Sequence, residues 1–463
     1  MKNFKKQIAL LAALACAGTM LAGCNSDNND DGGSNDGGNT PAADGGNTGG
    51  DSAGGADVLT ILSWTDADLK HMIPVFCEKY GYSESQIKYI QQGTSGGEAS
   101  EQYQQYLDDV NANGGEIDIL MLESDWILKY LNGTYTLPLA DVGITEADYA
   151  NAYKYTVDIG KDEEGVLRGG AYQAAPGGYV YRADLAETYL GVKTPDEMQA
   201  KVSDWAKFEE TAAAVKEASG GKTAMVATLG DMWQVYSYNR ANPWVVDNKL
   251  NLADSEGYYD VAKRFYDNGY VTDVSQWEDS WYAIGQDDTA MGYFFSTWCL
   301  GKGAQLEMAE GGEGGPTYGK YNICVGPTEY AWGGTWFAVS NHCDSKDMAA
   351  EWIKCFTCDA EGMEAYALAS GDYANNKVAM KKIVDEGTNS NDRLGGQDQF
   401  AVFLDVAEGI DLTGKITRYD STIKNNFNDT VKAYATGATA TKEEAIESFQ
   451  NKVAEALPGL AWD

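Results

Sequence analysis

Short apolar runs alternate with helical patterns in the part of the chain that follows residue 57. The runs at 58–63, 87–91 and 117–122 predict strands, and apolar residues recur at helical spacing over 69–80 and 98–110. The run at 117–122 has the apolar character of a strand that is buried on both faces. Strands that alternate with helices predict an α/β fold built on doubly wound, mainly parallel sheets.

The same alternation continues to the end of the sequence. Further strands are predicted at 223–227, 289–295, 322–325 and 335–340. Further helices are predicted at 183–190, 204–219, 253–268, 346–358, 360–369, 377–386, 422–435 and 442–456, and another begins at Leu229. Pro74 predicts a kink or an early end within the helix at 69–80, because proline has no N–H to donate.

The stretch from Ala174 to Leu185 interrupts this alternation. Pro176 fixes its own φ, the two glycines after it tolerate almost any backbone conformation, and an aromatic and β-branched run follows. A helix with Asp184 in its first turn then begins. We interpret the stretch as a bendable strand that leaves one α/β unit and enters another.

Length and composition narrow the class of protein. A chain of 463 residues is too long for one ordinary core, so at least two domains are expected. The net charge of −36 repels phosphate backbones and makes nucleic acid an improbable partner. Two histidines argue against His-based metal sites and most acid–base enzymes, and we expect no metal and no cofactor. The 29 Tyr and 12 Trp offer flat faces with one polar tip.

The first 23 residues have the pattern of a signal peptide. Lys2, Lys5 and Lys6 precede an apolar segment at 8–20 that is too short to span a membrane. The sequence Leu-Ala-Gly-Cys that ends at Cys24 resembles a lipobox, where cleavage leaves an acylated cysteine at the new N-terminus. A plain signal peptide followed by a chance cysteine is the alternative. More than one acyl chain on Cys24 would anchor the protein stably in a membrane.

Residues 24–56 consist almost entirely of Gly, Asp, Asn, Ser, Thr and Ala after the cysteine. Such a segment cannot bury apolar area, so we predict a disordered tether. Its Asp/Gly/Asn spacing faintly suggests calcium, but the strict ligand period of a calcium loop is missing.

Several polar and aromatic residues follow predicted strands or open helices. Ligands of open α/β sheets bind at the carboxyl ends of the strands, where a carboxylate can accept hydrogen bonds and a Trp can cover the C–H face of a sugar. Each Trp could equally belong to the core, and an early-helix acid could merely favour the helix dipole. The candidate ligand-binding residues are Trp64, Asp66, Glu123, Asp125, Asp231, Trp233, Trp298, Trp332, Gly334 and Gln397.

From about Val58 onward the chain resembles the extracellular solute-binding proteins of bacterial ABC importers, specifically the carbohydrate type of family 1, which is maltose-binding-protein-like. The landmarks are the 182–185 segment Arg-Ala-Asp-Leu, the Ala-Met pair at 290–291 with Trp298 soon after it, and the Gly-Gly pair at 333–334 before a strand. The resemblance implies two lobes joined by a hinge at Ala174–Leu185, with a second crossover near 322–327.

Roles also follow from the resemblance. It places sugar-gripping acids at Asp66 and Asp125, an acid–aromatic pair at Asp231 and Trp233, and a stacking face at Trp298. Two positions depart from the family pattern. Small residues near Ala175 replace the hinge glutamate, and Trp126 stands where the family has a cationic side chain.

The resemblance further implies an N-terminal lobe of residues 57–176 and 327–372 and a C-terminal lobe of residues 177–326 and 373–463. The expected function is capture of a carbohydrate, an oligosaccharide in particular, and its delivery to the transmembrane subunits of an ABC importer. The expected location is the outer face of the bacterial cytoplasmic membrane, with a monomer that contacts the membrane only through its lipid anchor.

A secreted hydrolase is the alternative. The Gly-Thr-Ser-Gly-Gly loop around Ser95 fits a nucleophile elbow between a strand and a helix, and His342 could complete a triad. The same loop is ordinary for a strand-to-helix turn. Glu123 and Asp125 could serve as a glycosidase pair, but they lie two residues apart and do not obviously flank a bond from two sides.

Six cysteines remain after residue 24: Cys77, Cys299, Cys324, Cys343, Cys355 and Cys358. The last two share a face of a predicted helix, and a redox or zinc role competes there with inert thiols or a disulfide. Export permits disulfides, but the sequence does not give their pairing.

Overall fold

The computed structural model describes residues 58–93 and 96–461. They belong to one compact unit that extends from Gly55 to Asp463. The predicted signal peptide, Cys24, the tether and Ser95 lie outside the described residues. Within the described part of the chain, no helix combines the length and the apolar character needed to cross a membrane.

The first sheet has five strands in the order β2-β1-β3-β10-β4. β1 (Leu59–Ser63) pairs in parallel with β2 (Ile87–Gln91) and β3 (Ile119–Glu123), as predicted. β10 (Thr335–Val339), which comes from much later in the chain, pairs antiparallel with β3 and with β4 (Gly169–Ala171). Every residue of β1 and β10 is buried, so this part of the sheet lies inside the core.

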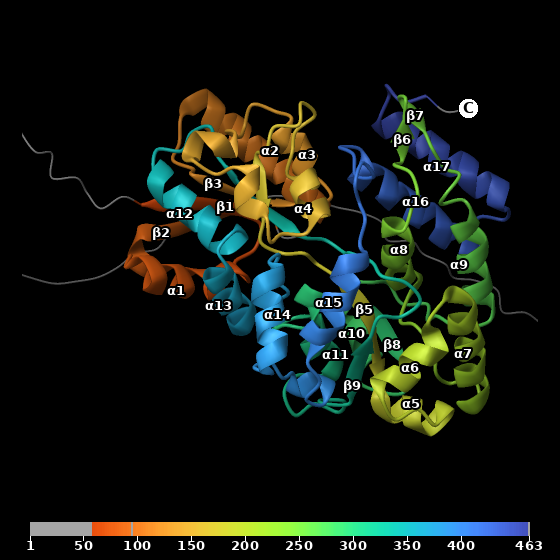
Figure 1. Cartoon of the computed structure of the whole chain (residues 1–463). Helices are drawn as coiled ribbons and strands as arrows, with labels where there is room; N and C mark the ends of the chain where they lie inside the picture. Colours follow the sequence, from red (N-terminus) through yellow and green to blue (C-terminus); the bar gives the residue numbers. More distant parts are fainter. Residues whose placement is uncertain (1–57, 94–95, 462–463) are drawn as a thin grey trace, which may run out of the picture. The chain divides into compact units, whose positions relative to one another are not determined.

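Helices cover both faces of this sheet (Figure 1). Successive residues of a strand point to opposite faces. Trp336 donates a 2.8 Å hydrogen bond to the carbonyl of Thr156 in α4 (Lys154–Ile159), whereas Phe337 packs against Trp352 of α12 (Lys346–Thr357). The other helices of this region are α1 (Leu69–Tyr80), α2 (Gly96–Asn113), α3 (Ile127–Leu131) and α13 (Ala360–Ser370). Helix α1 continues through Pro74, so the early end predicted there is wrong.

The second sheet contains β8 (Gly292–Ser296), β5 (Gly177–Arg182) and β9 (Tyr321–Cys324) in that order, and both neighbours run antiparallel to β5. The expectation of a mainly parallel sheet is wrong for these ladders. The strand predicted at 223–227 is also absent as a ladder, because its backbone pairs only at single residues. Its parallel bridges join Ala224 to Ala290 and Val226 to Val271.

Further helices surround the second sheet and the region beside it. Those between residues 183 and 310 are α5 (Ala183–Leu190), α6 (Pro195–Val202), α7 (Trp205–Ala218), α8 (Leu229–Tyr238), α9 (Gly257–Asp267), α10 (Asp279–Ala283) and α11 (Gln305–Glu310). The later set is α14 (Lys377–Glu386), α15 (Gln399–Gly409), α16 (Asp420–Ala435) and α17 (Lys442–Ala456). A two-residue hairpin pairs β6 (Val245–Val246) with β7 (Lys249–Leu250). In Figure 1, α16 and α17 lie together with α8 and α9.

The first predicted crossover lies beside the segment at 330–332, which follows the second predicted crossover at 322–327. Pro176 forms an isolated antiparallel bridge with Ala331, and the N–H of Trp332 donates to the carbonyl of Ala175 at 3.0 Å. Ala175 has a φ of +48°, which is uncommon for a residue with a side chain. The segment around Ala374 lies next to the residues that precede the first crossover, because Ala374 forms an isolated antiparallel bridge with Gln173. The lobe bounds of 57–176 with 327–372 and 177–326 with 373–463 stay a prediction.

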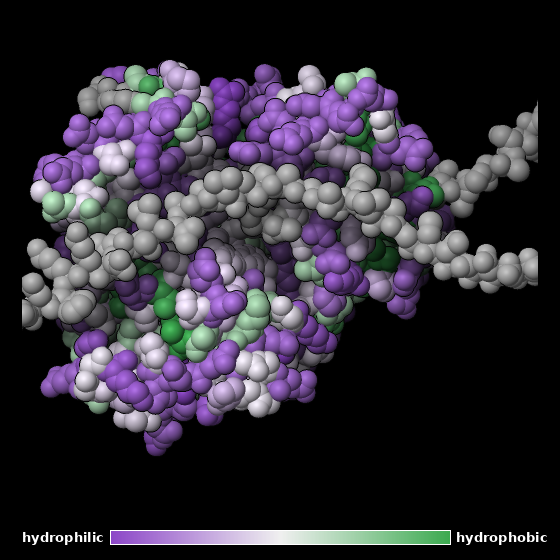
Figure 2. All heavy atoms as spheres, turned by 180° about the vertical axis from the view of Figure 1, so that it is seen from behind, coloured by the Kyte–Doolittle hydropathy of each residue, from purple (hydrophilic) through white to green (hydrophobic). Residues whose placement is uncertain are grey.

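All six cysteines of the described chain are free thiols. The described surface on the face shown in Figure 2 is mostly hydrophilic.

Candidate functional site

A cavity of about 840 Å³ lies where the first sheet, the crossovers, α8 and α16 meet. The carboxyl ends of β1 and β3 supply Trp64, Glu123 and Asp125 to its wall. The segment at 272–277, the turn after β8, helix α8 and one face of α16 supply further parts of the lining. The cavity therefore lies at the carboxyl ends of parallel strands, where open α/β sheets bind ligands.

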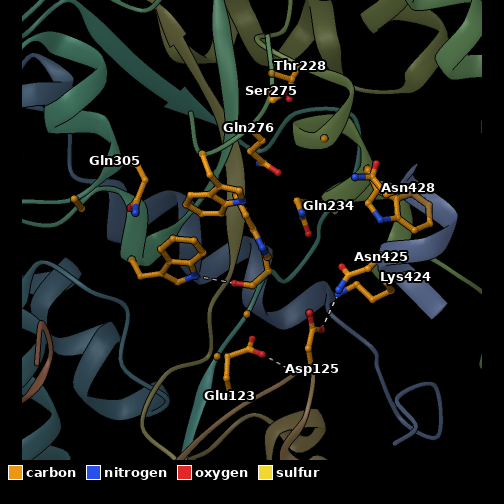
Figure 3. A pocket seen from close by; sticks show the side chains of 18 of the residues that line it. Glu123, Asp125, Thr228, Gln234, Ser275, Gln276, Gln305, Lys424, Asn425 and Asn428 are labelled. Atoms are coloured by element: carbon orange, nitrogen blue, oxygen red, sulfur yellow. Dashed lines mark hydrogen bonds and ion pairs between the residues drawn. The ribbon is translucent and has the colours of Figure 1, made fainter. Parts of the chain in front are cut away.

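Two carboxylates and a lysine form the charged part of the wall (Figure 3). Lys424 of α16 donates to Oδ1 of Asp125 at 2.7 Å. The backbone N–H of Asp125 and the hydroxyl of Ser124 donate to the two oxygens of Glu123, at 2.8 and 2.7 Å. Burial first, and then the charge of Asp125, raises the pKa of Glu123 to about 8. Glu123 is therefore protonated at neutral pH, and Asp125 carries the negative charge that Lys424 balances.

Tyr238 of α8 connects this charged group to the Gly-Gly pair at 333–334 that precedes β10. The ammonium of Lys424 lies 4.6 Å from the centre of the Tyr238 ring. The Tyr238 hydroxyl accepts from the N–H of Gly333 at 3.2 Å and lies 3.4 Å from the hydroxyl of Ser124. Burial would lower the pKa of Lys424, but the charge and hydrogen bond of Asp125, together with Tyr238 and Glu123, outweigh burial and raise the pKa. Lys424 is thus a permanently charged group inside a polar network.

Three tryptophans of the cavity wall form an aromatic cluster. The Trp298 indole donates to the carbonyl of Trp332 at 2.9 Å, and the two rings pack edge to face with centroids 4.9 Å apart. Trp277 is nearly parallel to Trp298, with an interplanar angle of 11° and centroids 6.1 Å apart. The cluster presents a large apolar face beside the polar wall, which is the combination that a sugar ring requires.

Further polar side chains line the cavity. Figure 3 shows Gln234 of α8, Asn425 and Asn428 of α16, and Gln305 around the cavity. Lys432 of α16 donates to the hydroxyl of Ser275 at 2.8 Å. Amides both donate and accept hydrogen bonds, so they suit a ligand with many hydroxyl groups.

Seven of the ten candidate residues line the cavity: Trp64, Glu123, Asp125, Trp233, Trp298, Trp332 and Gly334. Trp233 belongs mostly to the core, where it is 3 % exposed and packs against Phe427 with ring centroids 4.8 Å apart. Trp126, the departure noted in the sequence, is buried behind Trp64 with ring centroids 5.5 Å apart.

The other three candidates are not among the lining residues. Asp66 pairs with Lys70 at 2.9 Å at the outer surface, and this contact lowers the pKa of Asp66. Gln397 clamps the backbone of Ile323 in β9 through two hydrogen bonds of 2.9 Å. These two residues have structural partners, and the structure does not bring them to the cavity.

Asp231 is fully buried beneath the cavity wall. It accepts from the Thr228 hydroxyl at 2.6 Å and from the Trp281 indole at 3.1 Å. Burial raises the pKa of Asp231 to about 7. In the structure it supports the fold from beneath the cavity, and its contact with a ligand stays a prediction.

A second acidic pair, missed in the sequence, lies at another part of the lining. The Tyr366 hydroxyl is 2.8 Å from an oxygen of Asp68 and 3.0 Å from an oxygen of Asp372. Burial and the charge of Asp68 raise the pKa of Asp372 to about 7. Among the described residues there is no group of three or more His, Cys, Asp and Glu side chains that could hold a metal ion.

The contribution of α16 and of Trp277 was also missed. Ser421, Lys424, Asn425, Asn428 and Lys432 follow helical spacing, so a polar stripe was visible in the sequence. Such a stripe ordinarily faces solvent. Trp277 follows no strand and opens no helix, and no signal in the sequence singles it out.

Comparison with known proteins identifies the family. The sequence model described as "Bacterial extracellular solute-binding protein" matches residues 76–387. No curated protein matches the chain. Many solved structures share its fold.

One similar structure is an extracellular solute-binding protein of family 1, with 17% identity, a TM-score of 0.73, and coverage of 86% of this chain and 99% of that one. Another is the ABC transporter-associated binding protein of B. animalis subsp. lactis with β-1,6-galactobiose, with 17% identity, a TM-score of 0.67, and coverage of 88% and 100%. A third is the galacto-N-biose-/lacto-N-biose I-binding protein of Bifidobacterium longum with lacto-N-biose, with 14% identity, a TM-score of 0.65, and coverage of 89% and 100%.

These likenesses show a mixed α/β fold of the two-lobed, maltose-binding-protein-like kind. The family match covers more than half of the sequence. The chain belongs to the bacterial extracellular solute-binding protein family.

Proposed function

We propose that the protein captures a carbohydrate, an oligosaccharide in particular, in the cavity and delivers it to an ABC importer. The observation that carries the proposal is the apposition of the tryptophan cluster to a wall of carboxylates and amides. Tryptophan faces cover the C–H face of a pyranose, and charged or amide groups bond its hydroxyls. The structural neighbours in complex with β-1,6-galactobiose and with lacto-N-biose support the same class of ligand.

The size of the cavity supports an oligosaccharide. Its volume of about 840 Å³ lies in the upper part of the range of about 300–1,000 Å³ for small-molecule sites. We infer that the predicted lobes close around the ligand by movement at the crossovers.

Cys24 is proposed to hold the protein on the outer face of the cytoplasmic membrane through its acyl chains. This placement follows from the lipobox-like sequence and agrees with the extracellular character of the family. The importer subunits are separate partners in this proposal, and the protein acts as a monomer.

The protein is proposed to bind without catalysis. Glu123 and Asp125 lie on one turn and bond each other through backbone and side chain, so they do not face each other across a bond. His342, the partner considered for Ser95, is engaged with Asn111 at 2.6 Å. Both observations favour a binding role over hydrolysis.

A glycan panel tests the proposal. The full chain is incubated with neutral oligosaccharides, and its melting temperature is measured alongside chromatography of the sugars. A bound ligand raises the melting temperature by mass action, and we expect a shift without products. Release of monosaccharides or hydrolysis of a model ester, lost in Ser95→Ala or Glu123→Gln, would establish the hydrolase instead. Absence of a shift with every sugar would refute carbohydrate capture.

A further inference from the structure

Trp277 has the most unusual conformation in the cavity wall. Its φ is +75°, a region that bulky residues rarely adopt, and 49% of its side chain is exposed. Strained backbone at a functional site persists only where surrounding contacts hold it, and such strain points to a role. Trp277 lies between the bridge at Val271 and helix α10, on the cavity side of the second sheet.

Buried Asp231 holds the base of this segment. It accepts from the indole of Trp281 at 3.1 Å and lies within 3.4 Å of the Gln276 side-chain nitrogen. The Trp281 ring supports Trp277, with centroids 5.1 Å apart. The segment is therefore fixed on both sides of Trp277, while the Trp277 ring itself is half exposed.

Trp298, the partner of Trp277, is held much more firmly. Its indole is bonded to the Trp332 carbonyl at 2.9 Å, and the Trp332 ring packs against it. A Cβ at Gly333 would lie 3.2 Å from the Trp298 indole nitrogen, so the crossover backbone also confines the ring. One wall of the aromatic pair is thus rigid and the other is exposed to the cavity.

We propose that Trp277 and Trp298 form a slot that holds one pyranose ring between two aromatic faces, with Trp277 as the wall that moves. The centroid distance of 6.1 Å is an upper bound on the separation of two nearly parallel planes. A ring in van der Waals contact with both planes needs about 3.5–4.0 Å on each side, or about 7–8 Å in all. Trp277 must therefore withdraw by about 1–2 Å or more to admit a sugar.

The slot selects a class of sugar. A pyranose whose hydroxyls are all equatorial presents axial C–H groups on both faces, as in gluco- or xylo-configured rings. One axial hydroxyl places a polar group against an indole face, where it loses water without gaining a partner. The inference deepens the proposed carbohydrate function and rests on it.

A matched pair of epimers provides the test. Cellobiose and lactose differ only in whether one hydroxyl is equatorial or axial, and their affinities are measured by calorimetry with wild type, Trp277→Ala and Trp277→Phe. If the glycan panel identifies another linkage, the equatorial and axial epimers of that disaccharide are used. Trp277 is half exposed, so Trp277→Ala is expected to fold, which near-native melting temperature and circular dichroism would verify.

We expect wild type to prefer the equatorial epimer by about tenfold or more, and Trp277→Ala to reduce this ratio to about threefold or less. The ratio is informative because the cost of separating the two rings is common to both epimers and cancels. Trp277→Phe keeps a flat face and should retain most of the preference. Sugar binding should also change the near-ultraviolet circular dichroism of wild type, and this change should be absent in Trp277→Ala.

Two results would overturn the slot while leaving carbohydrate binding intact. One is equal affinity of wild type for both epimers, and the other is an unchanged ratio in Trp277→Ala. A protein that binds no sugar of the panel would instead refute the proposed function and the slot with it.

Discussion

The pair formed by Lys424 and Asp125 joins α16 to the turn after β3, and its removal should have a measurable effect. Lys424→Met keeps the length of the side chain and removes the charge. The Lys424 side chain is 8% exposed and that of Asp125 is 33% exposed. Breaking a fully buried pair costs about 3–5 kcal/mol, but water can reach Asp125 here. We therefore expect Lys424→Met to destabilise the protein by about 2 kcal/mol.

A double-mutant cycle separates the pair from the individual side chains. Wild type, Lys424→Met, Asp125→Asn and the double variant are unfolded in urea without ligand. We expect a coupling energy of about 1.5 kcal/mol or more that changes little between low and high salt, because partly buried charges are weakly screened. Conservation of the urea m-value would show that the variants still unfold as the same unit.

Lys381 and Asp385 provide the matched control. They form a 2.8 Å ion pair one turn apart on α14, with side chains 67% and 58% exposed. The same cycle there should give a coupling of only about 0.3–0.5 kcal/mol that salt abolishes. If the Lys424–Asp125 cycle were as weak and as salt-sensitive as the control, the network around Tyr238 would not stabilise the fold as argued.

Three further predictions concern the site and the anchor. The folded protein holds the Glu123 proton to about pH 8 and the unfolded chain releases it near its usual 4.5, so wild type loses stability as pH rises through this window. Glu123→Gln should therefore gain about 3–4 kcal/mol over wild type between pH 5 and 8 in urea unfolding, and a pH-independent difference would contradict this. Trp298→Ala should weaken sugar binding about a hundredfold by calorimetry, through lost stacking and burial, and wild-type affinity would contradict the site. Cys24→Ser should move the protein from the membrane fraction to the medium, and unchanged fractionation would contradict the lipid anchor.

Local sequence is enough to predict the first and last residues of several helices. Helices α1, α14 and α17 begin and end at the predicted residues. Gly81 and Gly387 end the first two in left-handed conformation, and Thr441 caps the third in a box with Glu444. Where such caps and a clear apolar period coincide, the sequence alone predicts where a helix begins and ends.

The second sheet shows where local sequence is insufficient. The run at 223–227 has the composition of a strand and is buried, yet it forms only single bridges. Pairing depends on the neighbours that the crossovers bring beside it, and those come from residues far away in the sequence. The direction of β8 and β9 against β5 is set in the same way and left no local signal.

In the candidate site, too, some residues were predictable from local sequence and others were not. The topological rule for strand ends placed Trp64, Glu123 and Asp125 correctly in the cavity wall. Asp231 has the same chemistry as Asp125 and also opens a helix, but only the folded structure shows that it is buried under Trp281. Burial depends on the packing of distant segments, which the chemistry of one residue does not reveal.

The carboxylates near the cavity differ in what they can offer a hydroxyl group. Burial keeps Glu123 protonated at neutral pH, and its two oxygens already accept from Ser124 and from the Asp125 backbone. Asp231 bonds Thr228 and Trp281 within the core. Of these three, only Asp125 is a charged group at the cavity surface. Its Oδ1 accepts a hydrogen bond from Lys424, and no described residue donates a hydrogen bond to its Oδ2. Because Lys424 balances its charge, Asp125 can accept a sugar hydroxyl without an unpaired charge being buried when the ligand covers it. The ion pair thus explains how an acidic residue can line a closed site for a neutral ligand.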